Sequence, residues 1–223
     1  MYRSKNDMGL IEGLKRLQEA YLILIIVVAF YLLISVGSST VAEYIEAAFV
    51  TMILVGAVRL LSGLTLLGDS HLDYSKAYRY ASKALRNTLM LLVADMLLGI
   101  INILDNSKFI INPTNLPVSA VVFLMDVVMF LTAISGIIFI IRYTRALHDI
   151  AEETSQNNYK YGATLLVFII ITGILIMLIN HASSDIYTQI APQLSLLTNG
   201  FYIINIISLY LCYNATSKSL QRF

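Results

Sequence analysis

The stretch that decides the fold is TLMLLVADMLLGIINIL, residues 88–104, which is apolar along almost its whole length. In hydrocarbon every backbone group must be paired within its own segment, so a run of this length predicts a helix that crosses a membrane. The one charged residue in the run is Asp95, which has apolar residues on both sides. A carboxylate is costly at that depth, so its role bears directly on what the protein does.

Composition extends this interpretation to the whole chain. Hydrophobic residues make up 58% of the 223 residues and charged residues 13%, whereas about a quarter of the residues in a soluble domain are charged. The net charge of +1 gives no reason to expect a nucleic-acid partner. Cys212 is the single cysteine, so no disulfide can form within the chain, and a small apolar role is expected for it. The chain is therefore predicted to be an integral membrane protein.

Six apolar blocks, each near the length that spans a bilayer, predict an all-α polytopic membrane bundle of six transmembrane helices. The chain is expected to form a single integral membrane domain over residues 1–223. Within it we predict an amphipathic cytoplasmic segment (1–19), the spans (20–213) and a cytoplasmic tail (214–223). The blocks are Ala20–Val36, Val41–Leu67, Ala84–Leu104, Pro117–Ile141, Tyr161–Asn180 and Leu194–Tyr213.

The basic residues indicate the orientation. Lys and Arg collect on the cytoplasmic side of a membrane protein, and with these spans almost all of them fall on one side, leaving Lys108 alone on the other. This asymmetry predicts a multi-pass protein of the cell membrane with both termini in the cytoplasm. Tyrosines near the same boundary are expected at headgroup depth. They are Tyr21, Tyr74, Tyr78, Tyr80, Tyr143, Tyr159, Tyr161 and Tyr213.

Two of the cytoplasmic junctions share a motif. Tyr78-Arg79-Tyr80-Ala81 and Tyr159-Lys160-Tyr161-Gly162 each follow an aspartate and lead into a span. We predict three tandem helical hairpins, which pair the first span with the second, the third with the fourth and the fifth with the sixth. Either a duplication or convergence on basic and aromatic boundary residues explains the shared motif.

The hairpin plan, and the junction ALHDIAEETSQNNYKYGATLLVFIII (residues 146–171) in particular, is similar to uncharacterised multi-pass membrane proteins of archaea. The resemblance covers the hairpins after the second span. It implies a bundle built from repeated helical hairpins, and it implies no activity and no site residues.

Arg59 and Asp95 are predicted to form an ion pair inside the membrane. Counting from the ends of their apolar blocks places Arg59 about 12 Å and Asp95 about 16 Å from the cytoplasmic boundary. Charges at such depths are expected to pair, and the Arg59 guanidinium can also reach toward the boundary. The pair has either a structural role in helix packing or a role in transport.

Three further acids offer another use for Asp95. Asp126 lies about 14 Å below the outer boundary, and Glu43 and Glu46 lie near the outer start of the second block on one helical face. Together these acids can form a descending cation or proton path that leads from Glu43 and Glu46 to Asp126 and then to Asp95. In the competing interpretation, Asp126 is a protonated carboxyl that bonds a neighbouring helix.

A basic stripe follows the second block. Lys76, Arg79, Lys83 and Arg86 recur at spacings of three, four and three residues, so on a helix they line one face. We expect the stripe to bind anionic lipid headgroups. The alternative is a platform for a soluble partner or an anionic ligand.

Small residues predict where helices touch. Gly56 and Gly63 lie two turns apart in the second block, and Thr132 and Gly136 lie four residues apart in the fourth. Such positions let two helix backbones approach closely.

The sequence nominates no cofactor, metal or catalytic site. His71 and His148 lie in corresponding junctions, but their spacing matches no ligand pattern. No phosphate-binding loop, nucleophile elbow or zinc-protease motif is found, so we expect a protein that is not an enzyme. Two functions are compatible with these features. One is a structural or accessory subunit of a membrane assembly, whose partner is a hetero-subunit or a second copy. The other is a small transporter or channel for protons, cations or a small solute. Polar residues are few inside the spans, which favours the subunit.

Overall fold

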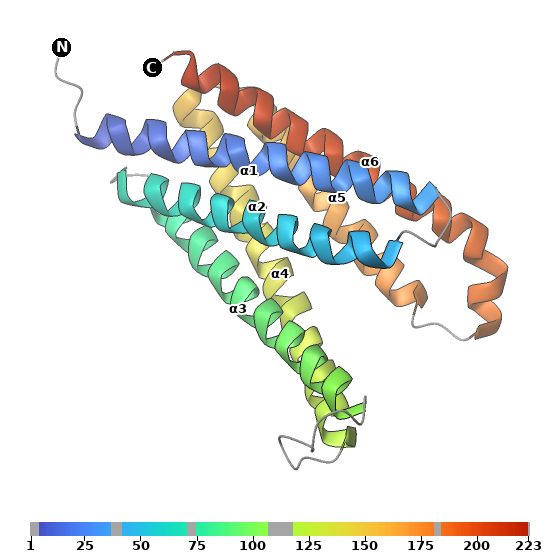
Figure 1. The fold of residues 1–223 in the computed structure, drawn as a ribbon. Helices are drawn as coiled ribbons and strands as arrows, with labels where there is room; N and C mark the ends of the chain where they lie inside the picture. Colours follow the sequence, from blue (N-terminus) through green and yellow to red (C-terminus); the bar gives the residue numbers. More distant parts are fainter. Residues whose placement is uncertain (1–4, 37–41, 71–74, 107–117, 181–183, 223) are drawn as a thin grey trace. The chain divides into compact units, whose positions relative to one another are not determined.

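Figure 1 shows the computed structural model, which describes residues 5–36, 42–70, 75–106, 118–180 and 184–222, with side chains over 8–33, 51–70, 76–101, 120–173 and 196–222. These residues are almost entirely helical, which confirms the predicted all-α class. The helices are α1 (Lys5–Val36), α2 (Ala42–Ser70), α3 (Ser75–Asn106), α4 (Val118–Thr154), α5 (Asn157–Asn180) and α6 (Ser184–Leu220).

Five helices are long and apolar enough to cross a membrane, judged over the described residues. They are α1, α2, α3, α4 and α6. This result supports the prediction of a helical membrane protein. The sixth span in α5, the tandem hairpins and the orientation stay predictions.

The helices are longer than the apolar blocks that predicted them. α4 and α6 have 37 residues each, which is about 55 Å of helix against a hydrocarbon core of about 30 Å. The stretch before Ala20, predicted as an amphipathic segment, is continuous with the first span in α1. Pro192, which precedes the last apolar block, lies within α6. Polar residues thus continue the helices past the apolar runs.

The turn between α4 and α5 is short and well defined. Only Ser155 and Gln156 separate the two helices. Ser155 has a φ of 53°, and the Gln156 N–H donates to the carbonyl of Ala151 at 3.2 Å. A left-handed residue followed by this backbone bond is the usual way to end a helix, although glycine is the residue most often found there. The junction between the fourth and fifth apolar blocks is therefore mostly helix.

The chain divides into two compact units. Unit 1 comprises residues 1–82 and 140–223, and unit 2 comprises residues 83–139. Within unit 1, α1 packs between α2 and α6, and α5 packs against α6 (Figure 1). α1 and α2 run antiparallel, because Gly13 of α1 meets Leu67 near the end of α2, whereas Leu24, later in α1, meets Gly56, earlier in α2.

Glycines let α1 and α2 approach closely. A Cβ atom added at Gly63 would lie 2.8 Å from the Leu17 Cδ2 and 3.0 Å from the carbonyl oxygen of Gly13. A Cβ at Gly56 would lie 3.0 Å from the Leu24 Cδ2. The contact predicted for Gly56 and Gly63 is confirmed. The contact predicted for Gly136 is wrong within the described chain, because a Cβ there would meet nothing within 4 Å.

Among the described side chains of unit 1, the buried core lies toward one end of the helices. Leu10, Leu14 and Leu17 of α1 are buried at helical spacing, and the end of α4 buries Leu147 and Ile150 in the same way. The later part of α1 instead exposes large apolar side chains, namely Leu22, Ile26, Phe30 and Leu33. An apolar surface of this kind is expected where lipid tails surround a helix.

Unit 2 consists of the remainder of α3 and the first part of α4. The hydroxyls of Thr88 and Ser135 lie 2.9 Å apart, and a Cβ at Gly99 would lie 4.0 Å from the Met125 Cε. These two contacts show that the helices run antiparallel. Among the described side chains of unit 2, those of Leu85 and Val121 alone are buried. Most of the surface of these two segments is therefore available to lipid or to another helix.

Candidate functional site

Arg59 has an acidic partner on α1. Its Nη1 lies 3.3 Å from the Oε2 of Glu19, and both side chains are partly exposed. Glu19 directly precedes the first predicted span. Arg59 therefore reaches toward the predicted boundary, as its long side chain allows. The sequence interpretation missed Glu19. The signal that could have revealed it is an acid directly before the span that neighbours Arg59 in sequence.

Asp95 lies on the face of α3 that meets α4. Thr88 and Gly99, which both contact α4, lie seven residues before and four residues after it, so the three share one helical face. The side chain of Asp95 is half-buried. Asp95 belongs to unit 2 and Arg59 to unit 1, so the predicted ion pair between them stays a prediction.

Asp126 lies on a different face of the same helix pair. It follows Met125, which contacts α3, and one residue turns a helix by about 100°. Its side chain is exposed. The Gly99–Met125 contact brings the two acids to within about 5 Å of the same level along the pair. Asp95 and Asp126 thus share a depth, but Asp95 is turned toward α4 and Asp126 away from α3.

The two other acids of the predicted path lie in the first turns of α2. Glu43 and Glu46 are helical, but they lie outside the part of the chain whose side chains are described. The path from Glu43 and Glu46 to Asp126 and Asp95 stays a prediction.

The basic stripe is helical and exposed. Lys76, Arg79, Lys83 and Arg86 all lie on α3 with exposed side chains. Arg79 is held in place, because its Nε donates to the carbonyl of Gly68 at 3.0 Å. The stripe is geometrically suited to lie against a charged surface, and its binding to headgroups stays a prediction.

Four tyrosines expected at headgroup depth are buried within unit 1. We call Tyr21, Tyr78, Tyr143 and Tyr159 the tyrosine core. The hydroxyls of Tyr21 and Tyr143 bond each other across α1 and α4. Tyr78 donates to the Oε2 of Glu153 at 3.0 Å, across α3 and α4. The depth of these four tyrosines in a membrane stays a prediction, whereas their burial between helices was not predicted.

The two copies of the tyrosine motif behave alike. In each copy the first tyrosine is buried (Tyr78 and Tyr159), whereas the second is exposed (Tyr80 by 52% and Tyr161 by 60%). Tyr159 donates to the Thr216 hydroxyl at 2.7 Å. Burial raises the pKa of the Tyr159 phenol above its ordinary value. The motif therefore has a packing role in both junctions.

The described side chains include no group of three or more histidine, cysteine, aspartate or glutamate residues that could hold a metal ion. Cys212 is buried, and a Cβ at Gly162 would lie 2.6 Å from its Sγ. The sulfur therefore fills the space beside a glycine, as a small apolar residue would. His148 bonds within its own helix, through Nδ1 and the carbonyl of Thr144 at 2.9 Å.

Comparison with protein-family models, curated proteins and solved structures finds no match for this chain. The resemblance to archaeal hairpin proteins therefore stays a prediction.

Proposed function

We propose that the chain is a non-catalytic subunit of a membrane assembly, and that Asp126 binds a partner helix inside the bilayer. The observation that carries the proposal is the exposed side chain of Asp126 within the candidate membrane span Ala120–Thr154. A charged side chain near the bilayer centre costs at least about 2.5–3.5 kcal/mol. A partner that offers a cationic side chain or an amide N–H removes most of that cost.

The face around Asp126 suits another helix. Val122, Met129 and Phe130 lie three or four residues from Asp126, and they are exposed by 43%, 50% and 60%. Gly136 adds a position where a second backbone can come close, because a Cβ there would meet nothing within 4 Å. One polar anchor in an apolar face is an arrangement that fixes the register of two helices.

A hetero-subunit is favoured over a second copy. Two copies that met symmetrically through this face would bring two Asp126 carboxylates together, and like charges at short range oppose each other. A partner span with Lys, Arg or His at the matching depth gives an attractive pair instead.

The alternative function is a small transporter or channel for protons or cations. The half-buried position of Asp95, on the α3 face that meets α4, favours it. The different facing of Asp126 weighs against a direct relay between the two acids. Proton flux into vesicles that is lost in Asp95→Asn and kept in Asp126→Asn would support this alternative.

Site-specific photo-crosslinking in the native membrane tests the subunit proposal. A photoreactive phenylalanine analogue replaces Phe130, one turn from Asp126, and for comparison replaces Phe168 of α5, which is exposed by 54%. We expect one discrete protein adduct from position 130 and none from position 168. The adduct should disappear when Asp126→Leu is added. Absence of a protein adduct at position 130 would overturn the proposal.

A further inference from the structure

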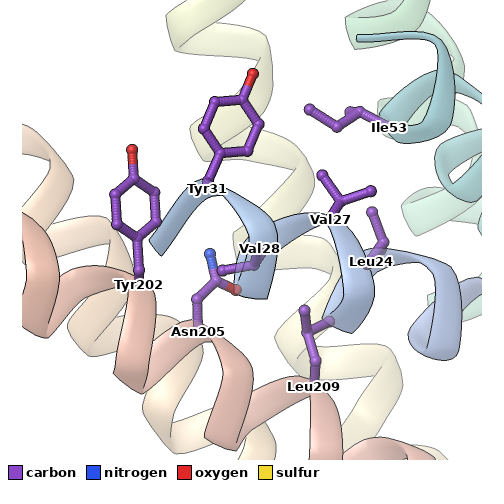
Figure 2. A pocket seen from close by; sticks show the side chains of 8 residues that line it. All are labelled: Leu24, Val27, Val28, Tyr31, Ile53, Tyr202, Asn205 and Leu209. Carbon is purple, nitrogen blue, oxygen red and sulfur yellow. The ribbon is translucent and has the colours of Figure 1, made fainter. Parts of the chain in front are cut away.

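A cavity of about 290 Å³ opens between α1, α2 and α6 in unit 1. Its walls are mostly apolar and are formed by Leu24, Val27, Val28, Ile53 and Leu209. Three polar residues complete the lining, namely Tyr31, Tyr202 and Asn205. Figure 2 shows the Asn205 amide pointing from α6 toward α1, with both tyrosines on the same side of it.

The polar end of the cavity lies deep in the predicted membrane. Tyr31 and Tyr202 are each eleven residues from the predicted boundary residues Ala20 and Tyr213, which is about 16 Å along a helix. Their rings stack with centroids 6.2 Å apart and planes 18° apart, so the two counts agree on one depth. Asn205 lies about 12 Å from the same boundary by the same count.

This depth decides which kind of molecule the cavity can take. The charged headgroups and ester groups of phospholipids stay at the interface, more than about 10 Å away. A plain hydrocarbon chain reaches the cavity but offers no hydrogen-bond partner to the Asn205 amide. The groups that match an amide are carbonyl or hydroxyl oxygens on an otherwise apolar molecule. Two nearly parallel aromatic rings also favour a flat ring as neighbour.

We propose that this cavity binds a lipid-soluble ring compound with carbonyl groups, the chemical class of the isoprenoid quinones. The volume fits the ring and the first carbons of its tail, since a cavity of about 150 Å³ already accepts benzene. Asn205 donates to a ring carbonyl, the tyrosine pair contacts the ring plane, and the leucine and valine side chains contact the tail. This site is independent of the partner surface at Asp126, which belongs to unit 2.

Binding to the full chain in phosphatidylcholine nanodiscs tests the proposal, with empty nanodiscs to subtract partitioning into lipid. The probe is a tritiated decyl-substituted benzoquinone, and the matched probe is decylbenzene, which has the same tail and ring but no carbonyl. We expect saturable binding of the quinone and at least tenfold weaker binding of decylbenzene, the factor that one lost hydrogen bond commonly gives. Equal binding of the two probes would overturn the proposal without any variant.

Variants locate the site. Asn205→Leu should weaken quinone binding about tenfold, and Val28→Phe should abolish it by filling the cavity. Tyr202→Phe keeps the stacked ring and should weaken binding less than Asn205→Leu, which gives a milder variant if the others do not fold. Gly200→Leu is the control, because it fills the separate cavity of about 300 Å³ between α5 and α6. Unchanged binding in folded Asn205→Leu and Val28→Phe would contradict the assignment.

Discussion

The guanidinium of Arg59 lies 3.3 Å from the carboxylate of Glu19 and joins α2 to α1. Both side chains are partly exposed, Arg59 by 39% and Glu19 by 52%. The pair is therefore closer to a surface ion pair than to a buried one. Its contribution to stability is expected to be a few tenths to about 1 kcal/mol.

A double-mutant cycle measures that contribution. Arg59→Gln and Glu19→Gln should show a coupling energy of up to about 1 kcal/mol in thermal unfolding in detergent. Glu12→Gln is the control, because Glu12 pairs with Arg16 at 3.0 Å in its own helix. Coupling of Arg59 to Glu12 as large as its coupling to Glu19 would contradict the ion pair. A cycle with Asp95→Asn would test the predicted Arg59–Asp95 pair in the same way.

Two glycine substitutions should have opposite effects. Gly63→Ala is expected to lower the free energy of unfolding by about 1–3 kcal/mol, because its Cβ would press on the Leu17 side chain and the Gly13 carbonyl. Gly136→Ala should be neutral or slightly stabilising, because the Cβ meets nothing within 4 Å and alanine favours helix. The check is the unfolding midpoint by circular dichroism. Similar midpoints for the two variants would show that α1 and α2 do not pack as described.

The two tyrosines of one motif should differ in the same assay. Tyr159→Phe removes a buried hydrogen bond to Thr216 and should cost about 1 kcal/mol of stability. Tyr161→Phe changes an exposed hydroxyl and should leave the unfolding midpoint unchanged. If Tyr161→Phe proved the more damaging variant, the placement of the two rings would be wrong.

The turn after α4 should be improved by glycine. For a residue other than glycine, the left-handed conformation that Ser155 adopts costs about 1 kcal/mol of conformational free energy. Ser155→Gly is therefore expected to stabilise the protein by about 0.5–1 kcal/mol. Ser155→Ala should have little effect, because the left-handed conformation is about as unfavourable for alanine as for serine. A lower unfolding midpoint for Ser155→Gly would contradict the turn.

Sequence reasoning succeeded where hydrophobicity alone decides structure. The apolar runs predicted a helix in each of the six places where one is found, because backbone groups in hydrocarbon have no other way to be paired. Gly56 and Gly63 were recognised because only small residues admit a close backbone.

Sequence reasoning failed where partners come from distant segments. Tyr78 and Tyr159 were predicted at headgroup depth, and their burial between helices was not foreseen. Their acceptors, Glu153 and Thr216, are more than fifty residues away in the chain. Glu19 was missed because the first span was predicted to begin at Ala20, one residue after it. The cavity with Asn205 could not be predicted, because its walls combine three helices.

The mass of the complex extracted gently from its own membrane tests the central claim most directly. Native mass spectrometry of the tagged wild-type chain should show a heteromer with one recurring partner. Asp126→Leu should release the partner, whereas Asp126→Glu, which keeps the carboxylate, should retain it. A wild-type chain that appears only as a monomer or a symmetric homo-oligomer would contradict the claim that this protein is a subunit held through Asp126.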